Sequence, residues 1–232
     1  MDNFKKMVLA CGACMTFGMS AAQAELVTNG GFETGDFSGW TAVSNGGTSG
    51  CQVNLWSVNS TGAQGCDGNG TNVSAPISGN FAAFNTYDGT DTNYTLSQTL
   101  VLPGSIGNAT LSFMNEYHMS YSGSPRTFRI DLYDATNTVL LANFFSQSPD
   151  YFANVGWTTH NLNVSAALAP QAGNTVILRF SNIIPDAYTG PAGFGLDNIS
   201  LTSDVPEPAS MALLAAGLMG LGLARRRAVE KA

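Results

Sequence analysis

Short runs of β-branched and aromatic residues recur between residues 25 and 204, and Gly, Asn, Asp and Ser separate them. Runs of this length bounded by turn-forming residues predict β-strands, and there is little sign of a long helix. Roughly ten strands at this spacing indicate an all-β, antiparallel β-sandwich. The runs that we expect to form strands are 25–28, 40–43, 53–58, 80–84, 94–100, 109–118, 127–134, 139–143, 156–164, 175–181 and 193–202.

Alternation along these runs predicts which side chains face the core, because successive residues of a strand point to opposite faces. Phe128, Ile130 and Leu132 share one parity and should be buried. The other parity carries charged and aromatic side chains that suit sugar binding, since aromatic faces stack on sugar rings and charged groups bond hydroxyls. An ion-paired sheet surface is the alternative. The candidate ligand-binding residues are Glu116, Arg129, Asp131, Tyr133 and Arg179.

The N-terminus has the pattern of a secretory signal peptide. Lys5 and Lys6 precede an apolar stretch at 7–19, and the small residues Ala22 and Ala24 flank Gln23. A basic segment, an apolar segment and a small-x-small site are the three parts of such a leader. We therefore expect residues 1–24 to be removed and the mature chain to begin at Glu25.

The C-terminus has a second three-part pattern. Pro206, Glu207 and Pro208 are followed by an apolar stretch at 209–224, and then by three arginines. That stretch would be about 24 Å long as a helix, slightly short of a comfortable span. The arginines should stay on the cytoplasmic side of a membrane. A short C-terminal membrane anchor is one interpretation. The basic cluster consists of Arg225, Arg226 and Arg227.

The order of these three parts resembles the PEP-CTERM sorting signal. The resemblance covers only the tail, 205–232, and leaves 25–204 as one β-sandwich domain. It implies export, transient inner-membrane anchoring through the apolar transmembrane helix, and processing near Pro206, Glu207 and Pro208 by an exosortase-type enzyme. The protein would then reside at the cell surface or outside the cell.

Charge and cysteine usage agree with export. Residues 25–204 contain three arginines, no lysine and thirteen acids, a net charge of −10. Such a surface repels nucleic acid, so we expect no nucleic-acid partner. Cys51 and Cys66 are the two cysteines that remain after the leader, and in an oxidising compartment we expect them to form a disulfide. Two free thiols are the alternative.

Two motifs open and close the folded region: Asn29-Gly30-Gly31-Phe32-Glu33 with Trp40 after it, and 193–201 with Asp197 and Asn198. Together they resemble galactose-binding-like jelly rolls, a class with many carbohydrate-binding modules. The resemblance implies a jelly-roll sandwich with a structural calcium where the two ends meet. Glu33 and Asp197 match its acidic ligands, whereas Asn198 replaces a second acid. The alternative is that Glu33 caps a turn and Asp197 bonds backbone amides.

Catalytic motifs are not recognisable in the sequence. The two histidines, His118 and His160, are far apart in the chain, and no metalloprotease, nucleophile-elbow or phosphate-loop motif occurs. Glu116 and His118 share a parity and could act as an acid–base pair, but a surface pair is the simpler explanation. We therefore name no catalytic residue and expect a non-enzymatic surface or matrix protein that binds extracellular polysaccharide. The alternatives are a polysaccharide-active hydrolase or lyase, and a purely structural matrix protein.

Overall fold

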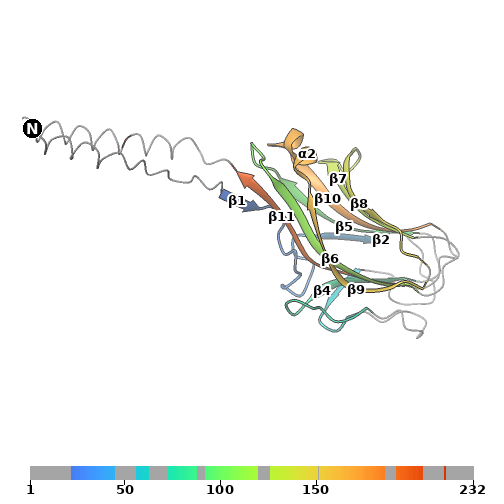
Figure 1. The fold of residues 1–232 in the computed structure, drawn as a ribbon. Helices are drawn as coiled ribbons and strands as arrows, with labels where there is room; N and C mark the ends of the chain where they lie inside the picture. The colour runs from blue at the N-terminus through green and yellow to red at the C-terminus, as the bar shows by residue number, and fades with distance from the viewer. Residues whose placement is uncertain are drawn as a thin grey trace, which may run out of the picture. The chain divides into compact units, whose positions relative to one another are not determined.

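The computed structural model describes residues 22–44, 56–62, 73–87, 92–119, 126–150, 152–185, 192–205 and 217. Within the compact unit Gln23–Pro206, two antiparallel sheets face each other, as the sequence predicted (Figure 1). In the described part of the chain, no helix combines the length and the apolar character needed to cross a bilayer. Residues 1–21 of the predicted signal peptide, Cys51, Cys66 and the tail from Pro206 to Arg227 lie outside the described residues, Gly217 excepted, whereas Ala22, Gln23 and Ala24 belong to the first strand.

Among the described residues, six strands form the first sheet, called sheet A, and five form the second, sheet B. In sheet A the order is β3 (Trp56–Asn59), β4 (Ala82–Tyr87), β11 (Ala192–Val205), β6 (Ala109–Met119) and β9 (Asn154–Asn163), and β1 (Ala22–Glu25) also pairs with β11. In sheet B it is β2 (Thr41–Ser44), β5 (Thr92–Val101), β10 (Thr175–Ile184), β7 (Thr127–Asp134) and β8 (Leu140–Gln147).

The chain repeatedly crosses between the sheets: β4 to β5, β5 to β6 and β6 to β7 each change sheet. A short helix, α2 (Ser165–Leu168), and a 3-10 turn, η2 (Ala169–Gln171), connect β9 to β10. All eleven expected strands overlap described strands, but the first shares only Glu25 with β1, which lies earlier in the chain than expected.

The core lies between the sheets and follows the predicted alternation. Phe128, Ile130 and Leu132 of β7 are buried, and so are the inward residues of β10, including Phe180. Aromatic rings join the sheets: Phe128 of β7 lies 4.5 Å from Phe194 of β11, centroid to centroid. Burial of these large side chains is the main force that holds the two layers together.

The outer face of sheet A is not open to solvent along its whole length. Residues 73–76, called here the covering segment, lie across it, and Val73 packs with Phe84 and Trp157 in a second apolar cluster. Gly195 makes this possible: a Cβ there would lie 2.8 Å from Trp157 Cη2 and 3.0 Å from Val73 Cγ1. The missing side chain thus leaves the space that the indole ring and Val73 fill.

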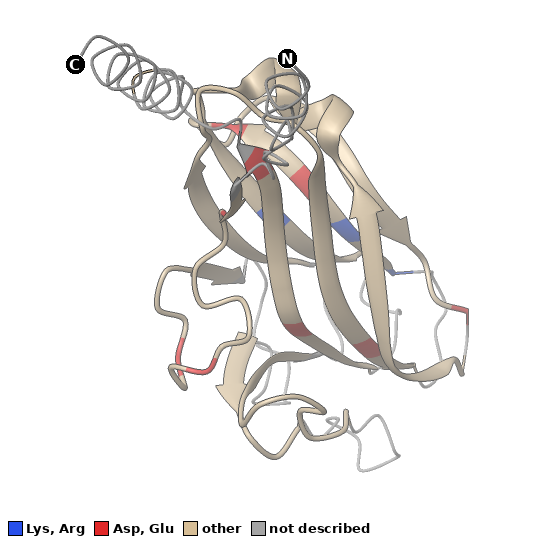
Figure 2. Ribbon diagram, turned by 60° about the vertical axis from the view of Figure 1, so that its left-hand side comes forward, with Lys and Arg blue, Asp and Glu red and all other residues tan. Residues whose placement is uncertain are grey.

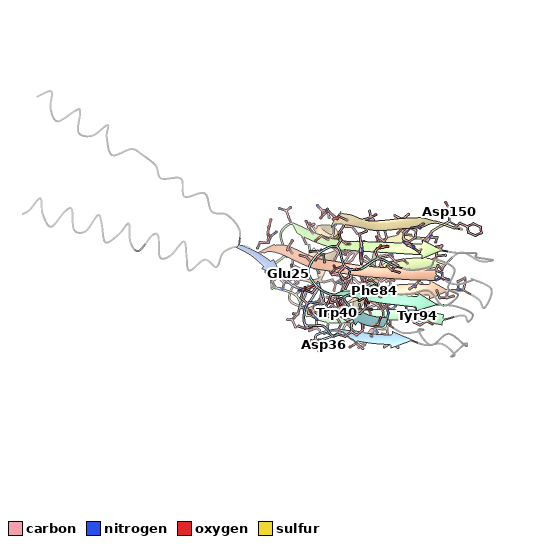
Figure 3. All side chains as sticks on the ribbon, turned by 90° about the horizontal axis from the view of Figure 1, so that it is seen from below. Glu25, Asp36, Trp40, Phe84, Tyr94 and Asp150 are labelled. Carbon is pink, nitrogen blue, oxygen red and sulfur yellow. The ribbon has the colours of Figure 1, made fainter. Side chains whose placement is uncertain are left out.

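Charge is distributed unevenly over the described residues. Figure 2 shows red acidic positions scattered over strands and loops, and blue basic positions at few places. Along the sandwich, Glu25 and Trp40 lie toward the end where β1 is, and Asp150 lies toward the opposite end (Figure 3). The polar groups that concern function fall into three clusters, on sheet B, on sheet A, and where β11 meets the N-terminal loop.

Candidate functional sites

The outer face of sheet B carries a stacked pair of side chains. Arg179 of β10 lies over the ring of Tyr133 of β7, with Cζ 3.6 Å from the ring centroid. Arg179 Nη1 also donates a hydrogen bond to Asn137 Oδ1 at 3.1 Å. Stacking on an aromatic face fixes the plane of a guanidinium group and leaves its N–H groups directed sideways. The pair forms because β7 and β10 are neighbours with residues of equal parity facing outward.

Asp131 lies beside this pair, directly opposite Arg179 in the strand register. Its Oδ1 accepts hydrogen bonds from Arg129 Nη2 at 2.9 Å and from Asn143 Nδ2 at 2.7 Å. Asp131 is only 2% exposed, because these neighbours cover it. Asp131 therefore orients Arg129, and the arginines are the groups that a ligand can reach.

Glu116 does not belong to this face, and the prediction that it shares a surface with Arg129, Asp131, Tyr133 and Arg179 is wrong. Glu116 lies on β6 in sheet A, whereas the other four lie in sheet B. It is also fully buried rather than exposed. The parity was right, since Glu116 pairs with Gly195 in the row that points away from the core, but the covering segment lies on top of it.

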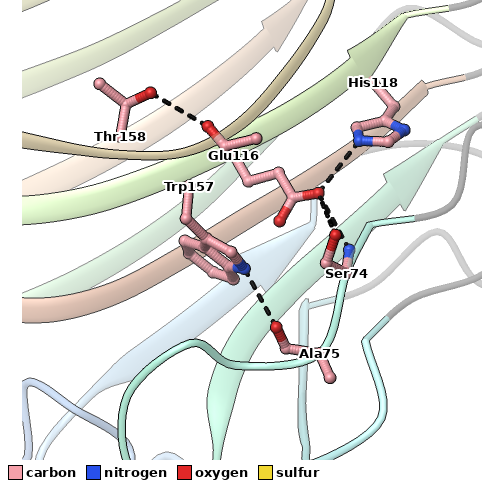
Figure 4. Close-up of polar contacts among 7 residues, drawn as sticks. Ser74, Ala75, Glu116, His118, Trp157 and Thr158 are labelled. Carbon is pink, nitrogen blue, oxygen red and sulfur yellow. Dashed lines mark hydrogen bonds and ion pairs between the residues drawn. The ribbon is translucent and has the colours of Figure 1, made fainter.

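Under the covering segment, Glu116 is the centre of a polar cluster (Figure 4). Its Oε1 accepts bonds from Ser74 N at 3.0 Å and from Ser74 Oγ at 2.8 Å. The same oxygen lies 3.0 Å from His118 Nε2. Its other oxygen, Oε2, is buried with no hydrogen-bond partner among the described residues. Next to this cluster, Trp157 Nε1 donates to the carbonyl oxygen of Ala75 at 3.1 Å.

Ser74 and Trp157 were not among the residues that sequence reasoning selected. Ser74 lies in a stretch rich in Gly, Asn and Ser, where no periodic pattern indicates a contact with a strand. Trp157 lies on the edge strand β9, and a large aromatic residue on an edge strand is the one signal that could have identified it.

The third cluster forms where the two end motifs meet. Ile199 N donates to the carbonyl oxygen of Gly30 at 2.9 Å, so the N-terminal loop lies directly against β11. A Cβ on Gly31 would lie 3.7 Å from Glu33 Cγ and 3.8 Å from Asp197 Oδ1. The structure therefore places Glu33 and Asp197 at the same junction.

The two carboxylates of this junction have different surroundings. Glu33 is exposed, and its oxygens accept bonds from Asn80 N at 3.0 Å and Phe81 N at 3.1 Å, which lower the pKa of its carboxyl group. Burial raises the pKa of Asp197 to about 7, against the bond from Asn198 N, and the charge of Glu33 raises it further. Asp197 Oδ2 is buried without a partner among the described residues.

A cation would suit this arrangement, because it would supply the positive charge that a dry carboxylate beside another carboxylate lacks. Glu33 serves as a turn cap at the same time, but a carboxylate oxygen has a second lone pair for a metal. Among the described residues, no group of three or more His, Cys, Asp or Glu side chains is positioned to hold a metal, so carbonyl oxygens would have to complete the shell.

The two histidines are not brought together. His118 faces outward beside Glu116. His160 stacks on Phe113 of the core, with centroids 4.7 Å apart, and its Nε2 lies 2.8 Å from Asn115 Oδ1. Burial lowers the pKa of His160. The histidines therefore do not share a site.

Solved structures resemble the sandwich at low sequence identity. The enzymatically active domain of tailspike protein 4 from bacteriophage CBA120 is 12% identical with a TM-score of 0.50, over 76% of this chain and 21% of that one. An arabinose-bound α-L-arabinofuranosidase is 16% identical with a TM-score of 0.50, over 78% of this chain and 26% of that one. This chain thus spans about a fifth and a quarter of their lengths, and these similarities bear on the fold alone.

The sandwich is also similar to the carbohydrate-binding module TmCBM61, solved with β-1,4-galactotriose, at 17% identity and a TM-score of 0.46, over 79% of this chain and 99% of that one. No curated protein sequence matches the chain.

One part of the chain, the C-terminal tail, matches a known sequence family. Residues 204–227 match the family model described as the PEP-CTERM protein-sorting motif, in agreement with the order of Pro206, Glu207 and Pro208, the apolar stretch and the arginines. Such a motif implies export, sorting to the cell surface and processing by an exosortase. The chain therefore carries an antiparallel β-sandwich followed by a PEP-CTERM protein-sorting motif.

Proposed function

We propose that this is an exported, non-enzymatic protein that binds extracellular glycan through the outer face of sheet B. The observation that carries the proposal is the stack of Arg179 on Tyr133, at 3.6 Å, beside the pair of Arg129 and Asp131. Two guanidinium groups held in place next to an aromatic ring offer directed donors for sugar hydroxyls, and their order lowers the entropy lost on binding. We interpret the crossings between sheets as a jelly roll.

Within this face, each residue has its own role. Arg129 and Arg179 donate to hydroxyl or carboxylate oxygens of the glycan. Asp131 is buried and holds Arg129. Tyr133 supports the Arg179 guanidinium on one ring face, so a sugar would contact the edge of the ring or its other face. Arginine rather than lysine at both positions favours planar, two-pronged contacts.

A hydrolase of the common type would instead need two carboxyl groups facing one cleft. Glu116, Asp131 and Asp197 are buried, and Glu33 is bonded to backbone amides. We assign non-catalytic roles to these four acids. A purely structural matrix protein remains the outcome expected if the sheet B face binds nothing.

For processing, we propose cleavage after Ala24 and again near Pro206, Glu207 and Pro208, with transient anchoring in the inner membrane between the two events. Glu25, the new N-terminal residue, is supported by its own contacts, because its Oε1 accepts bonds from Leu201 N and Val27 N, each at 2.9 Å. Mass spectrometry of the exported protein should find neither 1–24 nor the Arg225–Arg227 cluster. Recovery of that cluster on the extracellular product would refute the second cleavage.

At the junction of the two ends, we propose a structural calcium ion held by Glu33, Asp197 and loop carbonyls. The support is the buried Oδ2 of Asp197, which has no partner among the described residues, beside a second carboxylate. The ion would stabilise the fold and take no part in chemistry.

The glycan proposal is tested on an array with the purified exported protein and the variants R179A and Y133A. Loss of two or three hydrogen bonds should weaken binding by about ten- to a hundredfold. T159A, an exposed position on β9 in the other sheet, is the matched control. Equal glycan binding by the wild type and all three variants would show that the glycan site does not lie on the outer face of sheet B. If the folded wild type binds no glycan, the purely structural role is favoured.

A further inference from the structure

In the polar cluster on sheet A, only one of the two carboxylate oxygens of Glu116 accepts hydrogen bonds from described residues. Three donors, Ser74 N, Ser74 Oγ and His118 Nε2, converge on Glu116 Oε1, while Oε2 has none among the described residues. Glu116 is 0% exposed, so water does not reach this oxygen freely. Leaving one side of a buried carboxylate without a donor is costly, and a group that donated to both oxygens would bind it better than Ser74 does.

The surface under the covering segment has a bare backbone position flanked by large and charged side chains. Phe84, Gly195 and Glu116 form one row across β4, β11 and β6, all on the outward parity. The bare backbone of Gly195 lies between an aromatic ring and a carboxylate, and Trp157 extends over it. An indole ring, a carboxylate and an imidazole next to a glycine can hold a sugar, through stacking and through hydroxyl hydrogen bonds.

The covering segment makes the bonds that a sugar would make. The Ser74 hydroxyl donates to the carboxylate, as a sugar hydroxyl does, and the Ala75 carbonyl oxygen accepts the Trp157 N–H, as a sugar oxygen does. Val73 fills the space above Gly195. The segment thus occupies the position of a ligand and meets only part of the hydrogen-bonding demand.

We propose that Glu116, His118 and Trp157 form a second sugar site, which residues 73–76 occupy in the free protein and a neutral sugar ring uncovers by displacing them. Two neighbouring hydroxyls would donate to Oε1 and Oε2 of Glu116, and the ring would lie against Trp157. A neutral sugar is favoured over an anionic one because the site offers a carboxylate, and residues 25–204 carry a net charge of −10. The ligand class rests on the proposed function; the site and its cover do not.

Because residues 73–76 compete with the sugar, the apparent affinity equals the intrinsic affinity multiplied by the fraction of molecules in which the site is open. Weakening the contacts of residues 73–76 should therefore strengthen sugar binding. The variant S74P removes both donors of the covering segment to Glu116 and leaves Glu116, His118 and Trp157 unchanged. It is compared with its parent in an R179A background, which removes the sheet B face. The probe is an array of neutral and anionic oligosaccharides, followed by titration with the strongest soluble hit.

The expected result is that S74P/R179A binds neutral oligosaccharides about tenfold more tightly than R179A, the size expected for two lost hydrogen bonds of the cover. Adding E116Q should abolish the gain, and W157F should remove the tryptophan fluorescence change on binding. V73S weakens the apolar packing of the covering segment and should give the same increase in binding to neutral oligosaccharides. It replaces S74P in the experiment if S74P does not fold.

Two results would overturn the proposal: a folded S74P or V73S protein that gains binding to no neutral glycan, or a gain that survives E116Q. In either case residues 73–76 are a permanent part of the sandwich. Because R179A is the parent in each comparison, failure of the sheet B site would appear separately, as equal binding by R179A and the wild type.

Discussion

Asp197 and Glu33 meet at the junction of β11 with the N-terminal loop, where Asp197 Oδ1 and Glu33 Cγ both lie within 4 Å of the position that a Cβ would take on Gly31. Burial, together with the charge of Glu33, raises the pKa of the buried carboxyl group of Asp197 to about 7. The exposed member, Glu33, has its pKa lowered by backbone N–H groups. One junction therefore contains two carboxyl groups whose titrations have moved apart.

The raised pKa of Asp197 predicts that metal-free protein loses stability as pH rises. Below pH 3.8, the ordinary value, Asp197 is protonated in both the folded and the unfolded chain. Between 3.8 and about 7 the unfolded chain releases this proton while the folded chain keeps it, so the free energy of unfolding falls; above about 7 the loss is complete. The loss is on the order of a few kcal/mol, or several degrees in Tm.

Calorimetry of the wild type and D197N from pH 4 to pH 8, in chelator, measures this effect. The asparagine keeps the Oδ1 acceptor for Asn198 N but has no proton to lose in this range. The Tm of the wild type should fall relative to that of D197N across the window. D150N, an acid exposed after β8, should track the wild type. Parallel curves for wild type and D197N would show that Asp197 titrates normally.

Calcium should reverse that loss. A divalent cation at the Glu33–Asp197 junction binds only the folded chain, so the Tm should rise with calcium concentration, by an amount set by the ratio of free calcium to its dissociation constant. Magnesium, which demands a smaller octahedral shell, should act more weakly. The variants E33A and D197A should lose the calcium dependence while the fold remains mostly formed.

The calcium prediction is contradicted if chelator leaves the Tm unchanged and calorimetric titration of metal-free protein detects no binding. Glu33 would then be a cap for the turn before β4, held by Asn80 N and Phe81 N, and Asp197 would be a buried, protonated acid at pH values below 7.

Strand alternation was enough to predict the sandwich and which side chains of β7 point away from the core. Phe128, Ile130 and Leu132 are buried, and Arg129 and Tyr133 face outward, because a period of two is a local property of the chain. The meeting of Glu33 with Asp197 was suggested by motif resemblance, not by periodicity.

Glu116 shows where such reasoning stops. Its outward parity was read correctly, but whether an outward residue is exposed depends on what lies over it, here Ser74. Which sheet a strand joins is also a long-range property: β6 and β7 are consecutive in the chain yet lie in different sheets. Parity alone therefore grouped Glu116 with residues that are on the other layer of the molecule.

A disulfide between Cys51 and Cys66 stays a prediction, since both cysteines lie outside the described residues. Closing a loop of about 15 residues should stabilise the domain by roughly 3 kcal/mol, so reduction should lower the Tm by several degrees. The double variant C51S/C66S should have the lower Tm without reductant and should not respond to it. Quantitative alkylation of both thiols in unreduced protein would rule the bridge out.

The two end motifs approach each other closely at Gly30. A Cβ at this position would collide with the carbonyl oxygen of Ile199, and the backbone cannot easily move away, because Ile199 N is bonded to Gly30 O at 2.9 Å. The variant G30A should therefore separate the N-terminal loop from β11 and destabilise the fold by about 3 kcal/mol or more, which lowers the Tm by roughly 6–12 °C in a domain of this size.

Gly104 provides the matched control, because a Cβ there would meet nothing within 4 Å. G104A should change the free energy of unfolding by less than about 1 kcal/mol, and in the stabilising direction, since alanine restricts the unfolded chain. Thermal unfolding of both variants in chelator separates this effect from any metal. Equal Tm values for G30A and G104A would show that the N-terminal loop does not pack closely against β11 at Gly30. Glu33 and Asp197 would then not share the position on which the calcium proposal depends.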